Sequence, residues 1–427
     1  MLKNGLFRSI IILASGTALA QIINLVFIPL ITRQYGPEAY GMMGSFMSVI
    51  NILIPLSALS YPIAVVLPKR ALMASLLVRL SLWLGCMVAV LSVLLLIVGQ
   101  IFFPQALFSD KYPMWFWLLM PLMIVVLPFQ LTGQQWLIRT RSYKHIANIS
   151  VIQAAIVNVM RVGGGIISPL PVTLVVITAL GYVLQAGQFF SRALRSGLSI
   201  KSRAFQRGRL RKVARLYYDF PAFRTPQVLI NSLSQSLPIF IIGYYFGAAE
   251  AGFYALAQTI LGAPVTLLSG AISNVYYPRM SERVNSRLPI FTFILKSTLL
   301  LMLISALIYL VVILFGPWIF SLVFGDKWHM AGEFGRWMAL YCIFWLAARP
   351  AIDSIPPLKI QHFFLAYEIM SLVLRCGALM FGVMVLKSSL GAMAVFSLVN
   401  AFAYLSLCVL VIIMAKKFDK KMVNHDN

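Results

Sequence analysis

Residues 31–68 read ITRQYGPEAYGMMGSFMSVINILIPLSALSYPIAVVLP, and residues 242–278 read IGYYFGAAEAGFYALAQTILGAPVTLLSGAISNVYYP. The two stretches align at a constant spacing, because Gly36 pairs with Gly247 and Gly41 with Gly252 (247 − 36 = 252 − 41 = 211). Each stretch contains two apolar runs separated by a short break that carries glycine, and each ends in a proline followed by a basic residue. One supersecondary unit therefore occurs twice in the chain.

Two further motifs recur in the same order. Residues 108–112 (FSDKY) match residues 324–328 (FGDKW), and residues 160–163 (MRVG) match residues 374–377 (LRCG). The conserved order predicts two similar halves with short insertions between motifs. Membrane transporters are often built from such repeats, with the substrate site where the repeats meet.

The composition is that of a membrane protein. Of 427 residues, 61% are hydrophobic and only 11% charged, and the mean hydropathy is +0.90. Long continuous apolar runs without strand alternation predict an all-α integral membrane protein of about twelve transmembrane helices, six in each half. We expect the first run, residues 10–31, to be a retained helix because no cleavage site follows it. The predicted spans are residues 10–32, 40–67, 76–103, 113–137, 146–168, 171–190, 222–246, 251–276, 290–315, 331–350, 360–385 and 389–415.

The distribution of Lys and Arg predicts the orientation. These residues collect in every second break and at both termini, so both termini are expected to be cytoplasmic. The longest polar stretch, residues 192–215, is basic and is expected to join an N-terminal lobe, residues 1–191, to a C-terminal lobe, residues 216–427. It is interpreted as a solvated linker that touches anionic headgroups, or as a segment that gathers an anionic substrate or docks partner enzymes. No nucleic-acid partner is expected, since the cations are divided between apolar spans.

Amides mark one face of two predicted helices. Gln21 and Asn24 share a face of the first span, and Asn231 and Gln235 share a face of the seventh. Asn24 and Gln235 are equivalent in the repeat (235 − 24 = 211). Such amides hydrogen-bond neighbouring helices in many membrane bundles. Their presence on corresponding helices is also expected if both helices flank one central polar cavity.

Charged residues at bilayer depth give a sharper signal. Arg161 lies late in the fifth span and shares a face with Asn158, while Arg375 lies in the eleventh span with Glu368 seven residues before it. Charges at this depth are costly and usually face water or a partner. They are interpreted either as structural ion pairs or snorkelling side chains, or as forked donors for a phosphate. In the second case Glu368 would be an acidic group that carries a coupling proton or Na⁺.

Motifs for other chemistries are missing from the sequence. It contains no P-loop, dinucleotide fingerprint, nucleophile elbow or ligand-spaced metal motif, so we expect no cofactor, no metal site and no enzyme. The run Gly163-Gly164-Gly165 has no strand before it, which favours close helix packing over phosphate binding.

The segment Phe246–Gln258 (FGAAEAGFYALAQ) and its first copy Tyr35–Gly41 (YGPEAYG) resemble the polysaccharide flippases of the MOP exporter superfamily. The resemblance spans the whole chain and is strongest to O-antigen (Wzx-type) and capsule translocases. It implies a V-shaped transporter of the bacterial inner membrane that works by alternating access and uses a cation gradient. The implied substrate is an undecaprenyl-pyrophosphate-linked oligosaccharide moved from the cytoplasmic to the periplasmic leaflet. Membrane lipids, a polysaccharide polymerase and a chain-length regulator are the implied partners.

Residues and resemblance combine into one hypothesis about the site. Arg161 and Arg375 would neutralise the pyrophosphate while the lipid tail stays in the bilayer. Sugar hydroxyls would bond to five amides, namely Gln21, Asn24, Asn231, Gln235 and Gln258.

Three alternatives remain open. A multidrug antiporter of the MATE branch shares the fold but usually carries a carboxylate in its first or seventh helix, and the corresponding spans here have none. A peptidoglycan lipid-precursor flippase commonly has extra helices and several arginines in its first half. A non-transporting scaffold for glycan assembly is disfavoured by the charges that lie within the spans.

Overall fold

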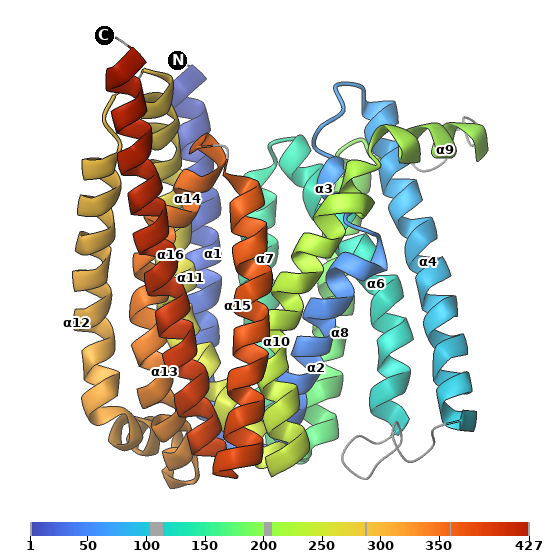
Figure 1. Ribbon diagram of the computed structural model, residues 1–427. Helices are drawn as coiled ribbons and strands as arrows, with labels where there is room; N and C mark the ends of the chain where they lie inside the picture. The colour runs from blue at the N-terminus through green and yellow to red at the C-terminus, as the bar shows by residue number, and fades with distance from the viewer. Residues whose placement is uncertain (1, 103–113, 200–206, 287, 359, 426–427) are drawn as a thin grey trace. The chain divides into compact units, whose positions relative to one another are not determined.

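The computed structural model describes residues 2–102, 114–199, 207–286, 288–358 and 360–425, and the regular elements within these ranges are all helices (Figure 1). The motif at residues 108–112 and residues 200–206 of the basic segment lie outside the described residues. The chain divides into two compact units, residues 1–236 and residues 237–427.

The first unit contains the helices of the N-terminal repeat. They are α1 (Leu2–Gln34), α2 (Pro37–Ser57), α3 (Tyr61–Ala64), α4 (Ala71–Phe102), α6 (Met114–Arg139), α7 (Tyr143–Ile167), α8 (Pro171–Arg195) and α9 (Arg207–Leu216), followed by the π-helical turn η1 (Phe220–Arg224). The boundary between the units falls inside α10 (Thr225–Phe246), just before Pro238.

The second unit contains the helices of the C-terminal repeat. They are α11 (Ala248–Asn285), α12 (Phe291–Phe324), the short η2 (Asp326–Trp328), α13 (His329–Ala347), α14 (Arg349–Leu358), α15 (Gln361–Phe381), the π-helical turn η3 (Gly382–Leu386) and α16 (Ser389–His425).

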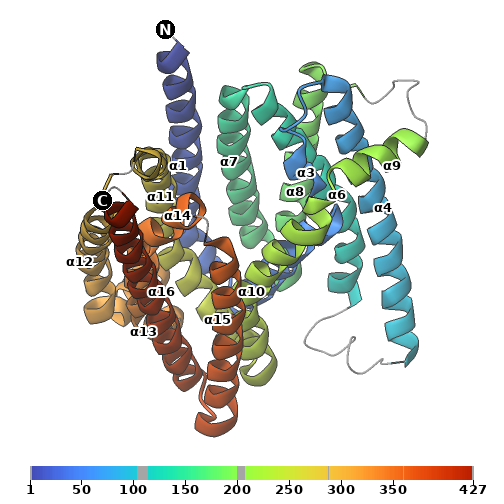
Figure 2. The same ribbon diagram turned by 45° about the horizontal axis from the view of Figure 1, so that its top comes forward.

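Three equivalent helix pairs pack in the two units. In the first unit α4 packs on α6, α6 on α8 and α7 on α8; in the second, α12 packs on α13, α13 on α16 and α15 on α16. Figures 1 and 2 show α4 beside α6, and α13 beside both α12 and α16, from two directions. These three pairs are equivalent in the two repeats, as the order of the repeated motifs predicts.

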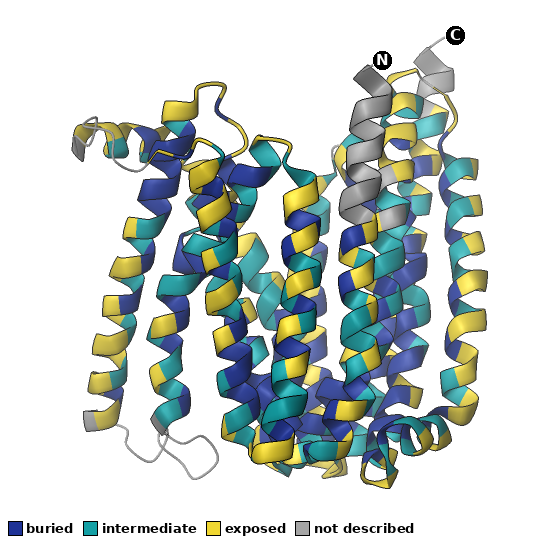
Figure 3. Ribbon diagram, turned by 180° about the vertical axis from the view of Figure 1, so that it is seen from behind, coloured by how far each residue is buried: buried dark blue, intermediate teal, exposed yellow. Residues whose placement is uncertain are grey.

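Twelve helical segments in the described chain are long and apolar enough to cross a membrane. Large apolar side chains lie exposed along α4 and α12, for example Leu95 (61%), Leu303 (60%) and Leu307 (62%). In Figure 3 the exposed residues, coloured yellow, recur along the length of the helices. A protein surrounded by water would bury much of this area, whereas lipid solvates it. The protein is therefore a multi-pass, all-α membrane protein, as the sequence predicted.

The predicted second span, residues 40–67, is wrong in its second half. Helix α2 ends at Ser57, and Leu59 and Ser60 adopt left-handed backbone conformations (φ 48° and 56°) before α3 begins. Pro62 has no N–H to continue the helical bonding, which favours this break. The equivalent α11 continues through Pro264 and Pro278 without interruption, so proline alone does not decide the matter.

Candidate functional site

Arg161 on α7 is half-buried and has polar neighbours. Its Nη2 donates to the hydroxyl of Thr178 on α8 (3.1 Å), and its Nη1 lies 3.5 Å from the side-chain oxygen of Asn158. Its Nε is buried and has no hydrogen-bond partner among the described residues. Since a guanidinium carries five N–H donors, Arg161 keeps donors for a ligand.

Asn158 connects this arginine to the first helix. Its amide nitrogen donates to the side-chain oxygen of Asn24 on α1 (2.6 Å) and to the carbonyl of Ala154 (2.8 Å). Asn158 is only 1% exposed, so these bonds satisfy a buried polar group. The structure thus brings together Asn24, Asn158 and Arg161, three polar residues that the sequence placed on helical faces.

Three tyrosines surround the same arginine. Tyr35, from the repeated Tyr-Gly motif, donates its hydroxyl to the carbonyl of Arg161 (3.1 Å), and burial raises the pKa of Tyr35, so this hydroxyl stays a donor. Tyr40 and Tyr182 lie close enough to Arg161 to interact with it electrostatically. Arg161, Asn24, Asn158, Thr178 and these three tyrosines together form the Arg161 cluster.

The glycine run explains how the cluster can form. A Cβ on Gly164 would lie 2.6 Å from Ile177 Cδ1 on α8, and one on Gly165 would lie 2.2 Å from Gln34 Oε1 on α1. A larger side chain at either position would displace these neighbouring side chains, so glycine favours the close approach of α7 to both helices. The prediction that these glycines serve close helix packing is confirmed at Gly164 and Gly165, whereas Gly163 faces open space.

Arg375 on α15 has different surroundings. It is 6% exposed, and its guanidinium carbon lies 5.4 Å from the ring centroid of Tyr404 on α16, a cation–π geometry. Half-buried Glu368, two turns earlier on α15, interacts electrostatically with Arg375. The positive charge of Arg375 therefore has an acidic group and an aromatic face nearby.

The remaining amides predicted to bind sugar lie on three different helices. Gln21 on α1, Gln235 on α10 and Gln258 on α11 are half-buried, and Asn231 on α10 is exposed. That these amides line one common cavity stays a prediction.

A buried polar group in the second unit was not predicted from the sequence. Asp353 on α14 is 8% exposed and accepts a hydrogen bond from Ser273 on α11 (2.6 Å). Arg349, one turn before it, pairs with the same carboxylate (3.3 Å) and donates Nε to Ser273 (2.8 Å). The i, i+4 spacing of Arg349 and Asp353 beside an apolar run was the available signal. This group ties α14 to α11.

Arg139 at the end of α6 also escaped prediction. Its guanidinium donates to backbone carbonyls of the segment after α3, including those of Pro68 and Lys69 (3.1 Å to Lys69). These carbonyls lie beyond a helix end and lack intrahelical partners. Arg139 therefore anchors the segment between α3 and α4, which follows the break in the predicted second span.

Several solved structures have a similar fold. The inward closed conformation of the lipid II flippase MurJ aligns with 97% of this chain and 91% of its own, at a TM-score of 0.71 and 13% identity. An inward-facing multidrug resistance MATE family transporter of the MOP superfamily covers 94% of this chain and 96% of its own, at a TM-score of 0.68 and 14% identity. A MOP superfamily transporter from Pyrococcus furiosus covers 96% of both chains, at a TM-score of 0.62 and 13% identity. The fold is that of the MOP superfamily.

Sequence comparison places the chain within one family. The family model described as "Polysaccharide biosynthesis protein" matches residues 30–333, and the chain belongs to this family. An amylovoran biosynthesis protein of Erwinia amylovora is 29% identical over 112 residues, and a teichuronic acid biosynthesis protein of Bacillus subtilis is 27% identical over 115 residues. These matches cover 26% and 27% of this chain but only 29% and 24% of the relatives' own lengths.

Proposed function

We propose that this protein is a flippase that moves an undecaprenyl-pyrophosphate-linked oligosaccharide from the cytoplasmic to the periplasmic leaflet of a bacterial inner membrane. Membership in a polysaccharide biosynthesis family supports a glycan substrate. The MOP-type fold supports transport by alternating access. The proposed orientation, with both termini cytoplasmic, follows from the distribution of Lys and Arg.

The observation that carries this proposal is the composition of the Arg161 cluster. The hydrogen-bond partners of the Arg161 side chain are the neutral Asn158 and Thr178, and its Nε has no partner in the described chain. A half-buried cation with neutral neighbours is expected to attract an anion, because its charge is poorly solvated and uncompensated. A pyrophosphate fits, since its oxygens accept the forked donors of arginine.

Glu368 is our candidate for the coupling residue. It is a half-buried carboxylate within a predicted span and lies near Arg375. Protonation or Na⁺ binding at Glu368 would change the charge beside Arg375. Arg375 would then bind the substrate anion only in one protonation or ion-bound state. Such a change in charge links a cation gradient to the conformational cycle.

Sugar recognition is assigned to the amides and to the aromatic residues beside Arg161. Asn24, Gln21, Gln235, Gln258 and Asn231 can each donate and accept hydrogen bonds with hydroxyl groups. The lipid tail remains in the bilayer because transferring it through a polar site would lose its apolar solvation.

A deletion strain tests the function directly. Radiolabelled or fluorescent lipid-linked glycan should accumulate in the deletion strain and be inaccessible to a periplasmic modifying enzyme in intact cells. Expression of the wild-type chain should restore accessibility. Increased drug sensitivity without glycan accumulation would instead indicate the MATE-type alternative. Lysis with accumulated peptidoglycan precursor would indicate a peptidoglycan lipid-precursor flippase.

A further inference from the structure

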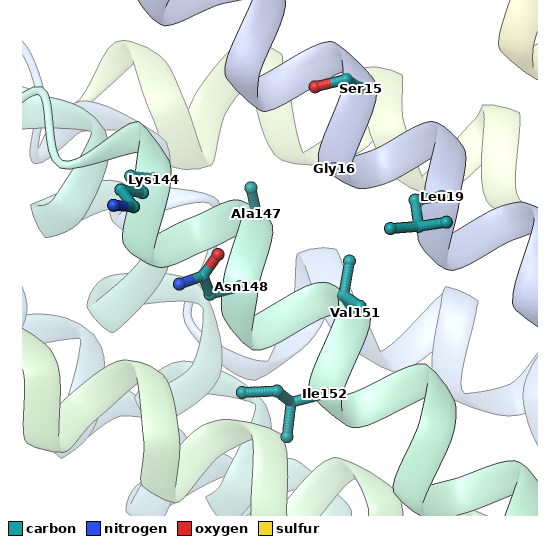
Figure 4. Close-up of a pocket in the computed structure, with 8 residues that line it drawn as sticks. All are labelled: Ser15, Gly16, Leu19, Lys144, Ala147, Asn148, Val151 and Ile152. Carbon is teal, nitrogen blue, oxygen red and sulfur yellow. The ribbon is translucent and has the colours of Figure 1, made fainter.

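A separate cavity lies at the other end of the helix pair that carries the Arg161 cluster. It has a volume of about 540 Å³ and opens between α1 and α7 (Figure 4). Helices α1 and α7 run in the same direction, because Gly16 meets Ala147 and Asn24 meets Asn158. The cavity therefore lies toward the N-terminal ends of both helices, the end that the charge distribution assigns to the cytoplasm.

The lining of this cavity is divided between polar and apolar side chains. The polar ones are Ser15, Lys144 and Asn148, and the apolar ones are Leu19, Val151 and Ile152. In both helices the polar residues come first and the apolar ones follow one turn deeper, as Figure 4 shows. Leu19 and Ile152 are each about half exposed (48% and 49%), so the apolar part opens at the surface.

A shallow polar end above an apolar groove matches one kind of ligand. A phosphate headgroup would meet the ammonium of Lys144 and the amide of Asn148, and its hydrocarbon chain would cover Leu19 and Ile152. Lys144 is exposed and can extend toward a headgroup. An uncharged lipid would leave the ammonium without an ionic partner, and a free anion would leave the apolar groove uncovered.

We propose that the cavity between α1 and α7 binds the phosphate headgroup and proximal chain of an anionic lipid. If the proposed function holds, the lipid-linked substrate would bind there before it moves to Arg161. Lys144 and Arg161 lie 17 residues apart on α7 (161 − 144), or about 25 Å at 1.5 Å per residue. Arg161 therefore lies most of a ~30 Å hydrocarbon thickness further along the helix than Lys144, so a lipid bound at Lys144 would have to move to reach Arg161.

Native mass spectrometry of the full-length protein released from nanodiscs tests the site. The nanodiscs contain phosphatidylglycerol and phosphatidylcholine, and the retained lipid is counted. Lys144→Ala should reduce retained phosphatidylglycerol about fivefold, since a cation at the membrane surface contributes about that factor. Ile152→Trp should fill the groove and remove the bound lipid, whereas Lys144→Arg should retain it. Val159→Trp is the matched control, because Val159 is exposed (58%) on the same helix and outside the cavity lining.

Three outcomes would overturn this proposal. In the first, Lys144→Ala and Ile152→Trp both retain phosphatidylglycerol like the wild type. In the second, phosphatidylcholine is retained equally well, and in the third, inorganic pyrophosphate alone displaces the lipid. Each result is independent of the proposed function, which Arg161→Ala tests at a different site. Glycan export by Ile152→Trp measures the loading role: slower export together with lost lipid supports it, and normal export with lost lipid contradicts it.

Discussion

Arg161 and Arg375 occupy equivalent positions in the two repeats (375 − 161 = 214), yet their surroundings differ. At the same spacing, Ala154 corresponds to Glu368 and Asn158 to Leu372. The first repeat thus has an amide one turn before its arginine and an alanine two turns before it. The second repeat has a leucine one turn before its arginine and a carboxylate two turns before it.

The difference separates two roles that one duplicated helix can take. The hydrogen-bond partners of the Arg161 guanidinium, Asn158 and Thr178, are neutral and do not offset its charge. Around Arg375 a carboxylate and the face of Tyr404 offset the charge. We infer that the first helix evolved toward anion binding and the second toward cation coupling. The predictions below test this division.

The largest effect is expected from Arg161→Ala. It should lower glycan export about 30- to 150-fold, because losing charge-assisted hydrogen bonds to an anion costs about 2–3 kcal/mol. Arg161→Lys should fall between this variant and the wild type, since lysine keeps the charge without the fork. Export is measured as surface polysaccharide in the deletion strain, with protein level in the membrane fraction as a check on folding.

Arg70→Ala is the matched control for this experiment, because Arg70 is an exposed cation just before α4 and outside the basic segment. It should export at the wild-type level. If Arg161→Ala and Arg375→Ala both give normal surface polysaccharide, neither arginine binds the substrate anion and the division of roles is wrong.

Glu368→Gln should uncouple transport from the gradient. Glutamine keeps the size of the side chain but can neither release a proton nor attract Na⁺. Transport in proteoliposomes should therefore stop responding to an imposed proton or sodium gradient and should fall to the rate measured without a gradient. Glu333→Gln is the control, because Glu333 pairs with Arg336 at the surface of α13. A gradient response retained by Glu368→Gln would exclude Glu368 as the coupling residue.

The architecture was largely predictable because lipid imposes strong constraints. An apolar run of some twenty residues must be a helix in a membrane, so the twelve spans could be read from the sequence and the repeat could be read from Gly36 and Gly247. The end of α2 at Ser57 could not be predicted from the sequence. Proline is present in both α2 and α11, and the backbone at Leu59 and Ser60 depends on tertiary contacts such as the bond from Thr225 to Ser60 (3.0 Å).

The site was predictable only within a single helix. Helical spacing placed Asn158 beside Arg161, but it could not show that Asn24 or Thr178 would meet them from other helices. The group of Arg349, Asp353 and Ser273 was missed because Ser273 lies 80 residues from Asp353, and only packing brings them together. Long-range pairs of this kind carry no local pattern.

A smaller effect is expected for the hydrogen bond between Asn24 and Asn158 in the Arg161 cluster. Asn24→Ala and Asn158→Ala should each lower the thermal stability of the purified protein, and the double variant should lose less than the sum of the two. The coupling free energy should be about 0.6–1.7 kcal/mol, the range for hydrogen bonds between membrane helices. Additive losses would mean that the 2.6 Å bond between these amides contributes little to stability.

The smallest effect concerns how the two arginine-bearing helices end. Helix α7 is followed by Ser168 in an extended conformation (φ −156°), whereas α15 continues through η3 to Lys387, which is left-handed (φ 49°) and exposed. Glycine adopts the left-handed region without a Cβ clash, so Lys387→Gly should raise the free energy of unfolding by about 0.5–1 kcal/mol. Ser168→Gly should lower it by a similar amount, because there glycine only increases the freedom of the unfolded chain. Thermal unfolding of both variants in the same detergent measures the contrast, and equal shifts of one sign would show that helix-end geometry does not distinguish the two repeats.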